Sequence, residues 1–383
     1  MTVLKALKRL LVPDFGNEVA ELLGGQSAEK EGSSPRSLGS GRVGVVNVRS
    51  SRGAAVRIFY PSDEDSASPA PLFRKGVPFF VEGYIRTVAG FFLPSHVSWF
   101  IYCCFYPFLF LIPLCYSQAP VSSLSPPPSP GTFPLIVWSH GLTGTGDEHA
   151  VLAAGLARRG FVVALPQHSD GSSSLADIEK DGAESRLFYQ FVDFSKYDQS
   201  FRQKQTEHRS SEVDEARTLA LSHPLLSKSL CSSNVIVAGF SFGAATAALS
   251  AATEPKNYRA AILIDGWYRI KFDSLKPPVD IRLPLQAHAL GLSLPSLFVG
   301  SAQFRDGDIN LATVELQGKS PKAEVHVLEG SKHGNFSDAV WWLPGAVLRR
   351  MGVVGKADPM GTYVNFFELV VDFAERHAAP REE

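Results

Sequence analysis

Six short apolar segments, separated by helical stretches, constrain the fold of this chain more than any other feature. The apolar segments are Leu135–Trp138, Phe161–Leu165, Val235–Ala238, Ala260–Ile264, Ser296–Val299 and Ala323–Leu328. The helical stretches are Glu148–Arg159, Ser211–Ser222, Gly243–Thr253 and, at the end of the chain, Thr362–His377. Apolar strands that alternate with helices are typical of a parallel sheet buried on both faces. The sequence therefore predicts an α/β fold with a mostly parallel central sheet and helices on both faces.

The composition excludes several other classes of protein. Hydrophobic residues make up 45% and charged residues 20% of the 383 residues, which is the composition of a folded rather than a disordered chain. The 37 basic and 38 acidic residues give a net charge of −1, so we expect no nucleic-acid partner. The four cysteines form no C-x-x-C pair, and we expect neither a disulfide framework nor a metal site.

The first 41 residues differ from the rest of the chain. Met1–Val12 places its leucines on one helical face and Lys5, Lys8 and Arg9 elsewhere, which predicts an amphipathic arm. Such an arm either lies on a membrane surface or packs on the body of the protein. The three charges also interrupt the apolar core that a secretory signal needs. We therefore expect a cytoplasmic location, with association with membranes.

A flexible linker separates this arm from one large domain. Gly24–Gly41 is rich in glycine, serine and charged residues, as flexible linkers are. Directly after it, Val43–Val48 and Ala54–Tyr60 flank a short polar turn and predict a β-hairpin. We therefore divide the chain into an arm and linker at 1–41 and an α/β domain at 42–383.

A long segment without charged residues interrupts this domain. Thr87–Gly146 contains no Asp, Glu, Lys or Arg, and Val97–Tyr116 within it is mostly apolar and long enough to span a bilayer. A buried cap, an interfacial patch and a membrane span all fit this apolar insertion, which we place at 87–130. Its aromatic residues favour contact with a lipid headgroup region, and we expect Phe108 and Phe110 to bind lipid.

The segment GFSFG at residues 239–243 is the strongest chemical signal in the chain. It matches G-x-S-x-G, follows the apolar segment 234–238 and opens a helix of small residues. On such a sharp strand-to-helix turn the flanking positions must lack side chains, and the helix directs N–H groups at the serine. We predict that Ser241 is a nucleophile; the alternative is a glycine-rich turn that only packs a helix on the sheet.

A nucleophilic serine requires a base and an acid. His333 follows the last apolar strand, at an edge where α/β sheets display functional groups, and we predict that it is the general base. The order Ser, acid, His along the chain is that of hydrolases. By spacing alone the acid that orients the imidazole is either Asp265 or one of Asp306 and Asp308, which end neighbouring strands.

Two backbone amides are predicted to hold the oxyanion. One is the amide of Phe242, the residue after the nucleophile. The other comes from the loop after an early strand, where the sequence is Ser-His-Gly-Leu, and Leu142 is our candidate. We expect His140 to brace this loop. The alternative is that His140 and Gly141 form an ordinary tight turn.

Taken in chain order, these motifs resemble the platelet-activating factor acetylhydrolases of the plasma and intracellular type II kind. The resemblance extends from about Val43 to the C-terminal helix. The blocks that carry it are Arg57–Pro61, Ser139–Leu142, Gly160–Ala164, His168–Asp170, Gly239–Thr246, Asp265–Trp267 and Lys332–Asp338.

The resemblance implies an α/β-hydrolase fold and a calcium-independent serine esterase. Its substrate would be the sn-2 acetyl or short or oxidised acyl ester of phospholipids such as platelet-activating factor. The family carries its acid in the Asp-x-Trp block and an oxyanion donor in the His-Gly-Leu block, which implies Asp265 and Leu142. The family also implies an apolar surface at the pocket mouth that contacts the membrane. We assign Trp267 and Phe240 to substrate contact.

The sequence departs from the family pattern at three positions. Phe240 stands where the family usually has histidine, Ala244 where it usually has glycine, and Ser169 where it usually has arginine. These departures bear on substrate preference more than on the chemistry.

Two other functions fit the same sequence. One is a general carboxylesterase, lipase or polyester hydrolase of the same fold. The other is an inactive hydrolase scaffold that binds lipid or a protein partner through the apolar insertion. A serine hydrolase mechanism requires no metal and no organic cofactor, and we expect none.

Overall fold

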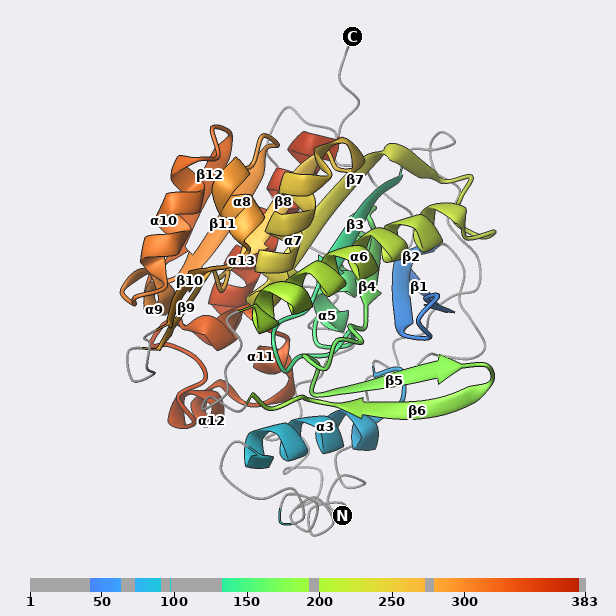
Figure 1. Cartoon of the computed structure of the whole chain (residues 1–383), viewed down its shortest axis with the longest axis horizontal. Helices are drawn as coiled ribbons and strands as arrows, with labels where there is room; N and C mark the ends of the chain where they lie inside the picture. Colours follow the sequence, from blue (N-terminus) through green and yellow to red (C-terminus); the bar gives the residue numbers. More distant parts are fainter. Residues whose placement is uncertain are drawn as a thin grey trace.

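The computed structural model describes residues 42–62, 73–90, 97, 133–192, 200–272 and 279–378. Their centre is an eight-stranded sheet in the order β1-β2-β4-β3-β7-β8-β11-β12 (Figure 1). Its strands are β1 (Arg42–Arg49), β2 (Ala55–Ser62), β3 (Phe133–Ser139), β4 (Val162–Pro166), β7 (Leu230–Phe240), β8 (Ala260–Ile264), β11 (Ser296–Ser301) and β12 (Ala323–Leu328).

Most neighbouring strands of this sheet are parallel. All pairs from β4 to β12 run parallel, whereas β1 and β2 form the predicted antiparallel hairpin, and β2 pairs antiparallel with β4. The mostly parallel α/β fold is therefore confirmed. The central strands are buried along their whole length, which is why they appear in the sequence as continuous apolar runs.

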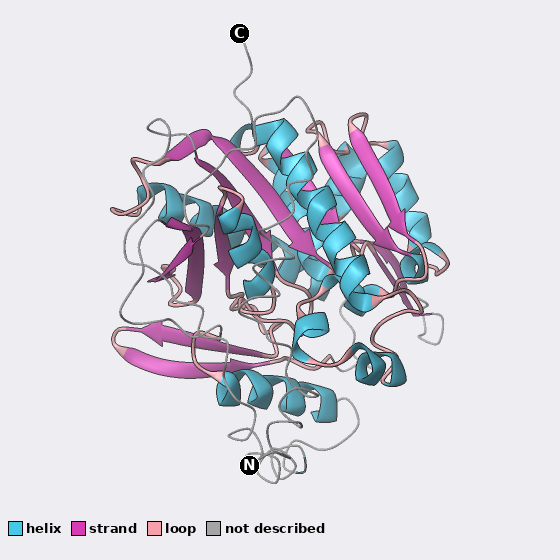
Figure 2. Cartoon of the chain, turned by 180° about the vertical axis from the view of Figure 1, so that it is seen from behind, coloured by secondary structure: helices cyan, strands magenta, loops and turns pink. Residues whose placement is uncertain are grey.

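Helices cover both faces of the sheet (Figures 1 and 2). One face packs against α5 (Ala150–Arg158) and α13 (Pro359–Ala378). The other packs against α6 (Phe201–Ser222), α7 (Phe242–Thr253), α8 (Leu285–Leu290) and α10 (Asn310–Gly318). Successive residues of a strand serve opposite faces, so Ile136 belongs to the first core and Leu135 and Val137 to the second.

Short elements that the sequence analysis did not predict gather beside this sheet. The hairpin of β5 (Leu175–Lys180) and β6 (Ala183–Phe188) lies with α3 (Val77–Gly90) at one end of the molecule (Figure 1). The remaining elements are β9 (Arg269–Phe272), β10 (Val279–Arg282), α9 (Ala302–Arg305), α11 (Ala339–Trp342), α12 (Gly345–Arg350) and the 3₁₀ turns Pro255–Asn257 and His333–Phe336. Aromatic rings join α3 to α11, since Phe80 packs edge-on against Trp342.

One predicted helix boundary is wrong. Helix α6 begins at Phe201 and not at Ser211. Its first turns bury polar side chains, among them Arg202, Gln205 and Arg209, so no apolar stripe marks them in the sequence.

Several predictions concern residues outside the described part. The arm and linker at 1–41, Phe108, Phe110 and all of Val97–Tyr116 except Val97 lie there. The chain enters the predicted insertion at 87–130 within α3, which ends at Gly90. In the ranges that the structure describes, no helix has both the length and the apolar character to cross a membrane.

Candidate active site

Ser241 lies on a sharp turn between β7 and α7. Its backbone has φ 58° and ψ −118°, a conformation that a residue with a side chain rarely adopts. The flanking glycines make the turn possible. A Cβ on Gly239 would lie 2.2 Å from the carbonyl oxygen of Gly243, and one on Gly243 would lie 2.0 Å from that of Ser139. The strand, turn and helix predicted around the G-x-S-x-G segment are therefore present.

Asp265 and His333 meet at the carboxyl ends of β8 and β12. Asp265 Oδ2 lies 2.7 Å from His333 Nδ1, and Asp265 Oδ1 accepts a hydrogen bond of 2.6 Å from the Ser301 amide. The aspartate side chain is buried, whereas 30% of the histidine side chain is exposed. A buried acid thus holds one nitrogen of an imidazole whose other side remains accessible.

The two alternative acids lie elsewhere. Asp306 is exposed and pairs with its neighbour Arg305. Asp308 is 73% exposed and pairs with Lys271 at 3.2 Å. The structure therefore joins only Asp265 of the three candidates to His333.

Two aromatic rings hold the imidazole of His333. Phe240 stacks on it with centroids 4.5 Å apart, and Phe304 stacks on it at 4.4 Å. The His333 amide also donates a hydrogen bond of 3.0 Å to Gln303 Oε1. Because Phe240 directly precedes Ser241, this stack brings the histidine to the serine's turn. The described hydrogen bonds of His333 do not include one to Ser241 Oγ.

The two predicted oxyanion donors lie beside Ser241. A Cβ on Gly141 would lie 3.3 Å from Ser241 Cβ, so the loop that carries Leu142 packs directly on the serine. The amide of Leu142 donates no hydrogen bond to a described residue. Phe242 is the first residue of α7, a position whose amide has no partner within the helix.

Trp267 also lies at this site. Its amide donates a hydrogen bond of 3.0 Å to the Ser241 carbonyl, and its ring contacts that of Phe242 edge-on at 5.9 Å. Trp267 is half-buried. Phe240, in contrast, is buried against His333 and His149, so the described structure assigns it packing contacts rather than an open face.

A second Ser-His-acid arrangement, which the sequence analysis missed, lies in the interior. Ser139 Oγ is 2.8 Å from His168 Nε2, and His168 Nδ1 is 2.7 Å from Glu212 Oε2. Burial, followed by the charge of Arg209, lowers the pKa of His168. Burial alone would raise the pKa of Glu212, but hydrogen bonds from His168 and His208 lower it below its ordinary value. We call Ser139, His168 and Glu212 the buried relay.

The signal for the buried relay is only partly readable in the sequence. Ser139 and His168 stand in two blocks of the family resemblance, but Glu212 is one carboxylate among several on a polar helix. Nothing in its spacing distinguishes it from a solvated residue.

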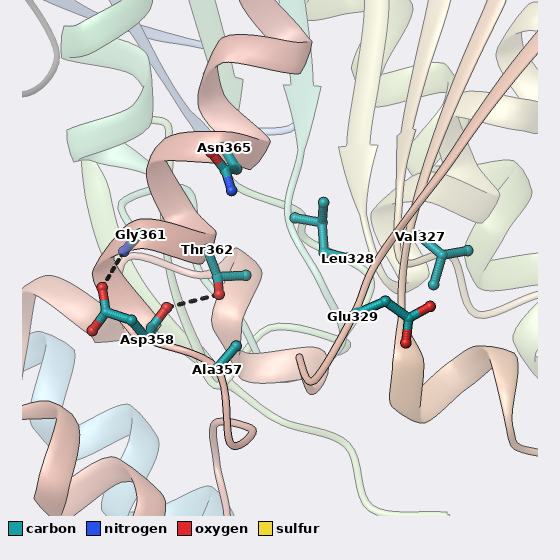
Figure 3. Close-up of a pocket in the computed structure, with 8 residues that line it drawn as sticks. All are labelled: Val327, Leu328, Glu329, Ala357, Asp358, Gly361, Thr362 and Asn365. Atoms are coloured by element: carbon teal, nitrogen blue, oxygen red, sulfur yellow. Dashed lines mark hydrogen bonds between the residues drawn. The ribbon is translucent and has the colours of Figure 1, made fainter.

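A pocket of about 320 Å³ lies between the end of β12 and the start of α13, and none of the predicted site residues lines it (Figure 3). The side chain of Asp358 caps the first turn of α13 there, accepting a hydrogen bond of 2.6 Å from the Gly361 amide. Among the described residues, no three His, Cys, Asp or Glu side chains are grouped so as to hold a metal ion.

Comparison with known proteins identifies the family. The family model described as "Platelet-activating factor acetylhydrolase, isoform II" matches residues 26–383. The chain belongs to this family. The predicted family and the predicted enzyme class, a serine ester hydrolase, are thereby confirmed.

Individual acetylhydrolases of this family are distant in sequence. The platelet-activating factor acetylhydrolase of Canis lupus familiaris is 24% identical over 356 residues, covering 85% of this chain and 72% of the relative. That of Cavia porcellus is 23% identical over 359 residues, covering 87% and 74%. Among solved structures, a ferulic acid esterase from Streptomyces cinnamoneus aligns with a TM-score of 0.60 at 20% identity over 91% of this chain and 94% of its own. That likeness shows the fold.

Proposed function

We propose that this protein is a calcium-independent serine esterase that hydrolyses the sn-2 acetyl ester, or a short or oxidised acyl ester, of phospholipids such as platelet-activating factor. The observation that carries the proposal is the Asp265–His333 pair, which lies at the strand ends beside the strained turn of Ser241. Family membership supports the class of substrate.

The proposed reaction passes through an acyl-enzyme. Ser241 Oγ attacks the ester carbonyl while His333 takes its proton, and Asp265 orients and stabilises the resulting imidazolium. The amides of Leu142 and Phe242 stabilise the negative charge on the carbonyl oxygen. His333 then returns the proton to the leaving lyso-phospholipid oxygen. Water, deprotonated by His333, releases the acyl group and restores the serine.

We further propose that the protein acts in the cytoplasm at a membrane surface, through the apolar insertion. An exposed apolar ridge at α12 supports the contact with a membrane surface. Val347 and Met351 are 41% and 63% exposed and lie one helical turn apart, in α12 and at its C-cap, and Leu343, in the extended segment before α12, is 40% exposed. The ridge directly follows Trp342, which packs against α3, the helix that leads into the insertion. Apolar residues gathered on one surface are typical of lipid-contacting sites.

The test of the catalytic proposal is release of acetate from sn-2-acetyl ether phosphocholine in the presence of EDTA. The wild type should release acetate, and the rate of release by Ser241→Ala should be at least about 10⁴-fold lower. Ser139→Ala is the matched control, because this serine also faces a histidine but is fully buried. It should keep most of its rate per folded molecule.

Two outcomes would change the proposal. If p-nitrophenyl butyrate is cleaved through Ser241 but the phospholipid is not, the protein is a general carboxylesterase. If Ser241→Ala hydrolyses either ester as the wild type does, the serine mechanism is wrong.

The membrane proposal is tested by binding to phosphatidylcholine vesicles. Replacing Val347 and Met351 with serine should weaken binding at least about tenfold, because about 1.5–3 kcal/mol is lost per buried apolar side chain. Unchanged binding would contradict a role for the ridge.

A further inference from the structure

Arg209 is a charged residue in the interior that the reaction above does not use. It lies on α6, is 0% exposed, and its guanidinium reaches the loop that carries Leu142. Arg209 Nη1 donates a hydrogen bond of 2.8 Å to the carbonyl oxygen of His140, and Nη2 donates one of 3.2 Å to that of Gly141. Nε donates to Ser172 Oγ at 2.9 Å. A single side chain therefore holds two successive carbonyls of the loop.

The Gly141 carbonyl belongs to the same peptide group as the Leu142 amide. A trans peptide is planar, and its C=O and N–H point in opposite directions. Holding the Gly141 oxygen therefore fixes the direction of the Leu142 N–H. His140 Nδ1 at 2.8 Å and the Gly144 amide at 3.2 Å contact the same oxygen. Donors on a carbonyl also polarise its peptide group and strengthen the N–H as a donor.

The protonation of His140 fits this arrangement. Its Nε2 accepts a hydrogen bond of 3.3 Å from the His168 amide, which leaves the proton on Nδ1 for the Gly141 carbonyl. Burial, followed by the charges of Arg209 and His168, lowers the pKa of His140. The ring is therefore neutral at pH 7. The prediction that His140 braces the loop agrees with these contacts.

Arg209 also contacts the side chain of Phe242, the residue whose amide is the second predicted oxyanion donor. Its guanidinium carbon lies 4.5 Å from the centre of the Phe242 ring. Burial lowers the pKa of Arg209 to about 10, partly offset by Asp170, whose Oδ2 lies 3.4 Å from Nε, so the side chain stays charged at pH 7. Glu148 lies on the loop that carries Leu142. Burial, followed by the charge of Asp338, raises the pKa of Glu148 to about 8, so this acid is mostly neutral at pH 7.

We propose that Arg209 is the positioning residue of the oxyanion hole, which holds the Gly141–Leu142 peptide so that the Leu142 amide faces the carbonyl oxygen of the substrate. The inference rests on the proposed function, since it concerns the same serine. Arg209 is expected to stabilise the transition state, in which the oxyanion carries its charge, and not to affect binding of the uncharged ester group.

The test compares Arg209→Lys with the wild type on the acetyl ester. A lysine keeps the charge but has no planar fork to reach both carbonyls and Ser172. We expect kcat to fall about 10²-fold, the effect of one oxyanion donor, with KM within about threefold of the wild type. Arg202→Lys is the matched control, because Arg202 is a buried arginine of the same helix that binds Gln205 and Tyr189 instead of the loop. It should keep its kcat.

A second readout separates positioning from a merely structural role. A trifluoromethyl ketone adds to a catalytic serine and forms a hemiketal whose pKa, measured by ¹⁹F NMR, reports how well the site stabilises an oxyanion. In Arg209→Lys this pKa should rise by about one unit or more, since each unit is a tenfold loss of stabilisation. A loss of folded molecules would reduce the signal and leave the pKa unchanged.

Each outcome decides the proposal. An unchanged hemiketal pKa in Arg209→Lys overturns the positioning role while leaving Ser241 as the nucleophile. If that variant does not fold, Ser172→Ala removes the anchor of Nε and should raise the hemiketal pKa by a smaller amount; no rise overturns the proposal. If the wild type forms no adduct, and Ser241→Ala keeps its activity, the proposed function fails and this inference with it.

Discussion

Two histidines in this protein each have a carboxylate oxygen 2.7 Å from Nδ1, but one imidazole is partly exposed and the other is fully buried. His333, paired with Asp265, has 30% of its side chain exposed at the end of β12. His168, paired with Glu212, has none, and its Nε2 is already occupied by Ser139. The pairing is shared, so the chemistry of the residues does not distinguish a candidate active site from a structural network. Access to a second molecule does.

The two serines differ chiefly in backbone conformation, since both are buried, Ser139 at 0% and Ser241 at 8% exposure. Ser139 ends β3 in an ordinary extended strand and is completely buried. Ser241 has a positive φ and lies where β7 turns into α7. Backbone strain of this kind persists only where the surrounding structure imposes it, and it presents the side chain at the top of the sheet. The strained backbone of Ser241 and the partly exposed imidazole of His333 support the proposal that these two residues react with the ester.

The largest expected effect comes from removing the two imidazoles separately. His333→Ala should lower ester hydrolysis about 10⁴-fold or more, because the serine loses its base, with little change in melting temperature. His168→Ala should destabilise the fold by about 2–3 kcal/mol, because it removes one hydrogen-bond partner of the buried Glu212 carboxylate and the partner of the buried Ser139 hydroxyl. Hydrolysis per folded molecule and thermal unfolding measure both. More than a tenth of wild-type activity in His333→Ala would contradict the assignment.

Replacing the two acids should have the same contrasting effects, on activity for Asp265 and on stability for Glu212. Asp265→Asn is expected to reduce kcat by about 10⁴-fold, since the amide favours the wrong imidazole tautomer, and to leave KM nearly unchanged. Glu212→Gln should lower the melting temperature and keep kcat within about tenfold of the wild type. Steady-state kinetics on equal amounts of folded protein test this. If Glu212→Gln loses more activity than Asp265→Asn, the two pairs have been assigned the wrong way round.

Gly243 is the point where the buried relay and the serine turn touch. An added Cβ would lie 2.0 Å from the Ser139 carbonyl oxygen, which is backbone and cannot move aside alone. We expect Gly243→Ala to destabilise the fold by about 3 kcal/mol and to reduce activity. Gly318→Ala, at the end of α10 with nothing within 4 Å, should be neutral or stabilise by about 0.5 kcal/mol. Equal melting temperatures for the two variants would show that the contact is not tight.

The smallest expected effect is a pH dependence of stability that belongs to the buried relay. The folded-state pKa of Glu212 is lowered, so its contribution is present above its unfolded pKa of about 4.3 and is lost as the pH falls toward the folded value. The difference in melting temperature between wild type and Glu212→Gln should therefore shrink between pH 6 and pH 3. A difference that is constant over this range would mean that the carboxylate is not stabilised by its partners.

The elements that were predicted from the sequence are those with a local pattern. The strands β8 and β12 were predicted with their observed ends, because buried parallel strands appear as apolar runs. The serine turn was predicted from its local G-x-S-x-G pattern. The contact that requires glycine is local at Gly239, whereas at Gly243 it is made by the Ser139 carbonyl of a different strand. The choice of Asp265 over Asp306 and Asp308 was not reached by spacing and came only through the family resemblance.

Only the tertiary structure decided the rest. The pairing of β8 with β11 brings Asp265 to the Ser301 amide and to His333, which is 68 residues away along the chain. Arg209 and Glu212 belong to a helix whose polar side chains would face solvent if it stood alone. They are buried because α6 packs across β3 and β4, and no periodicity of polar residues records which helix face the sheet will cover. The sequence thus determined the strand-to-helix turn of Ser241 through a local pattern, and long-range packing decided which acid contacts His333 and which arginine holds the loop that carries Leu142.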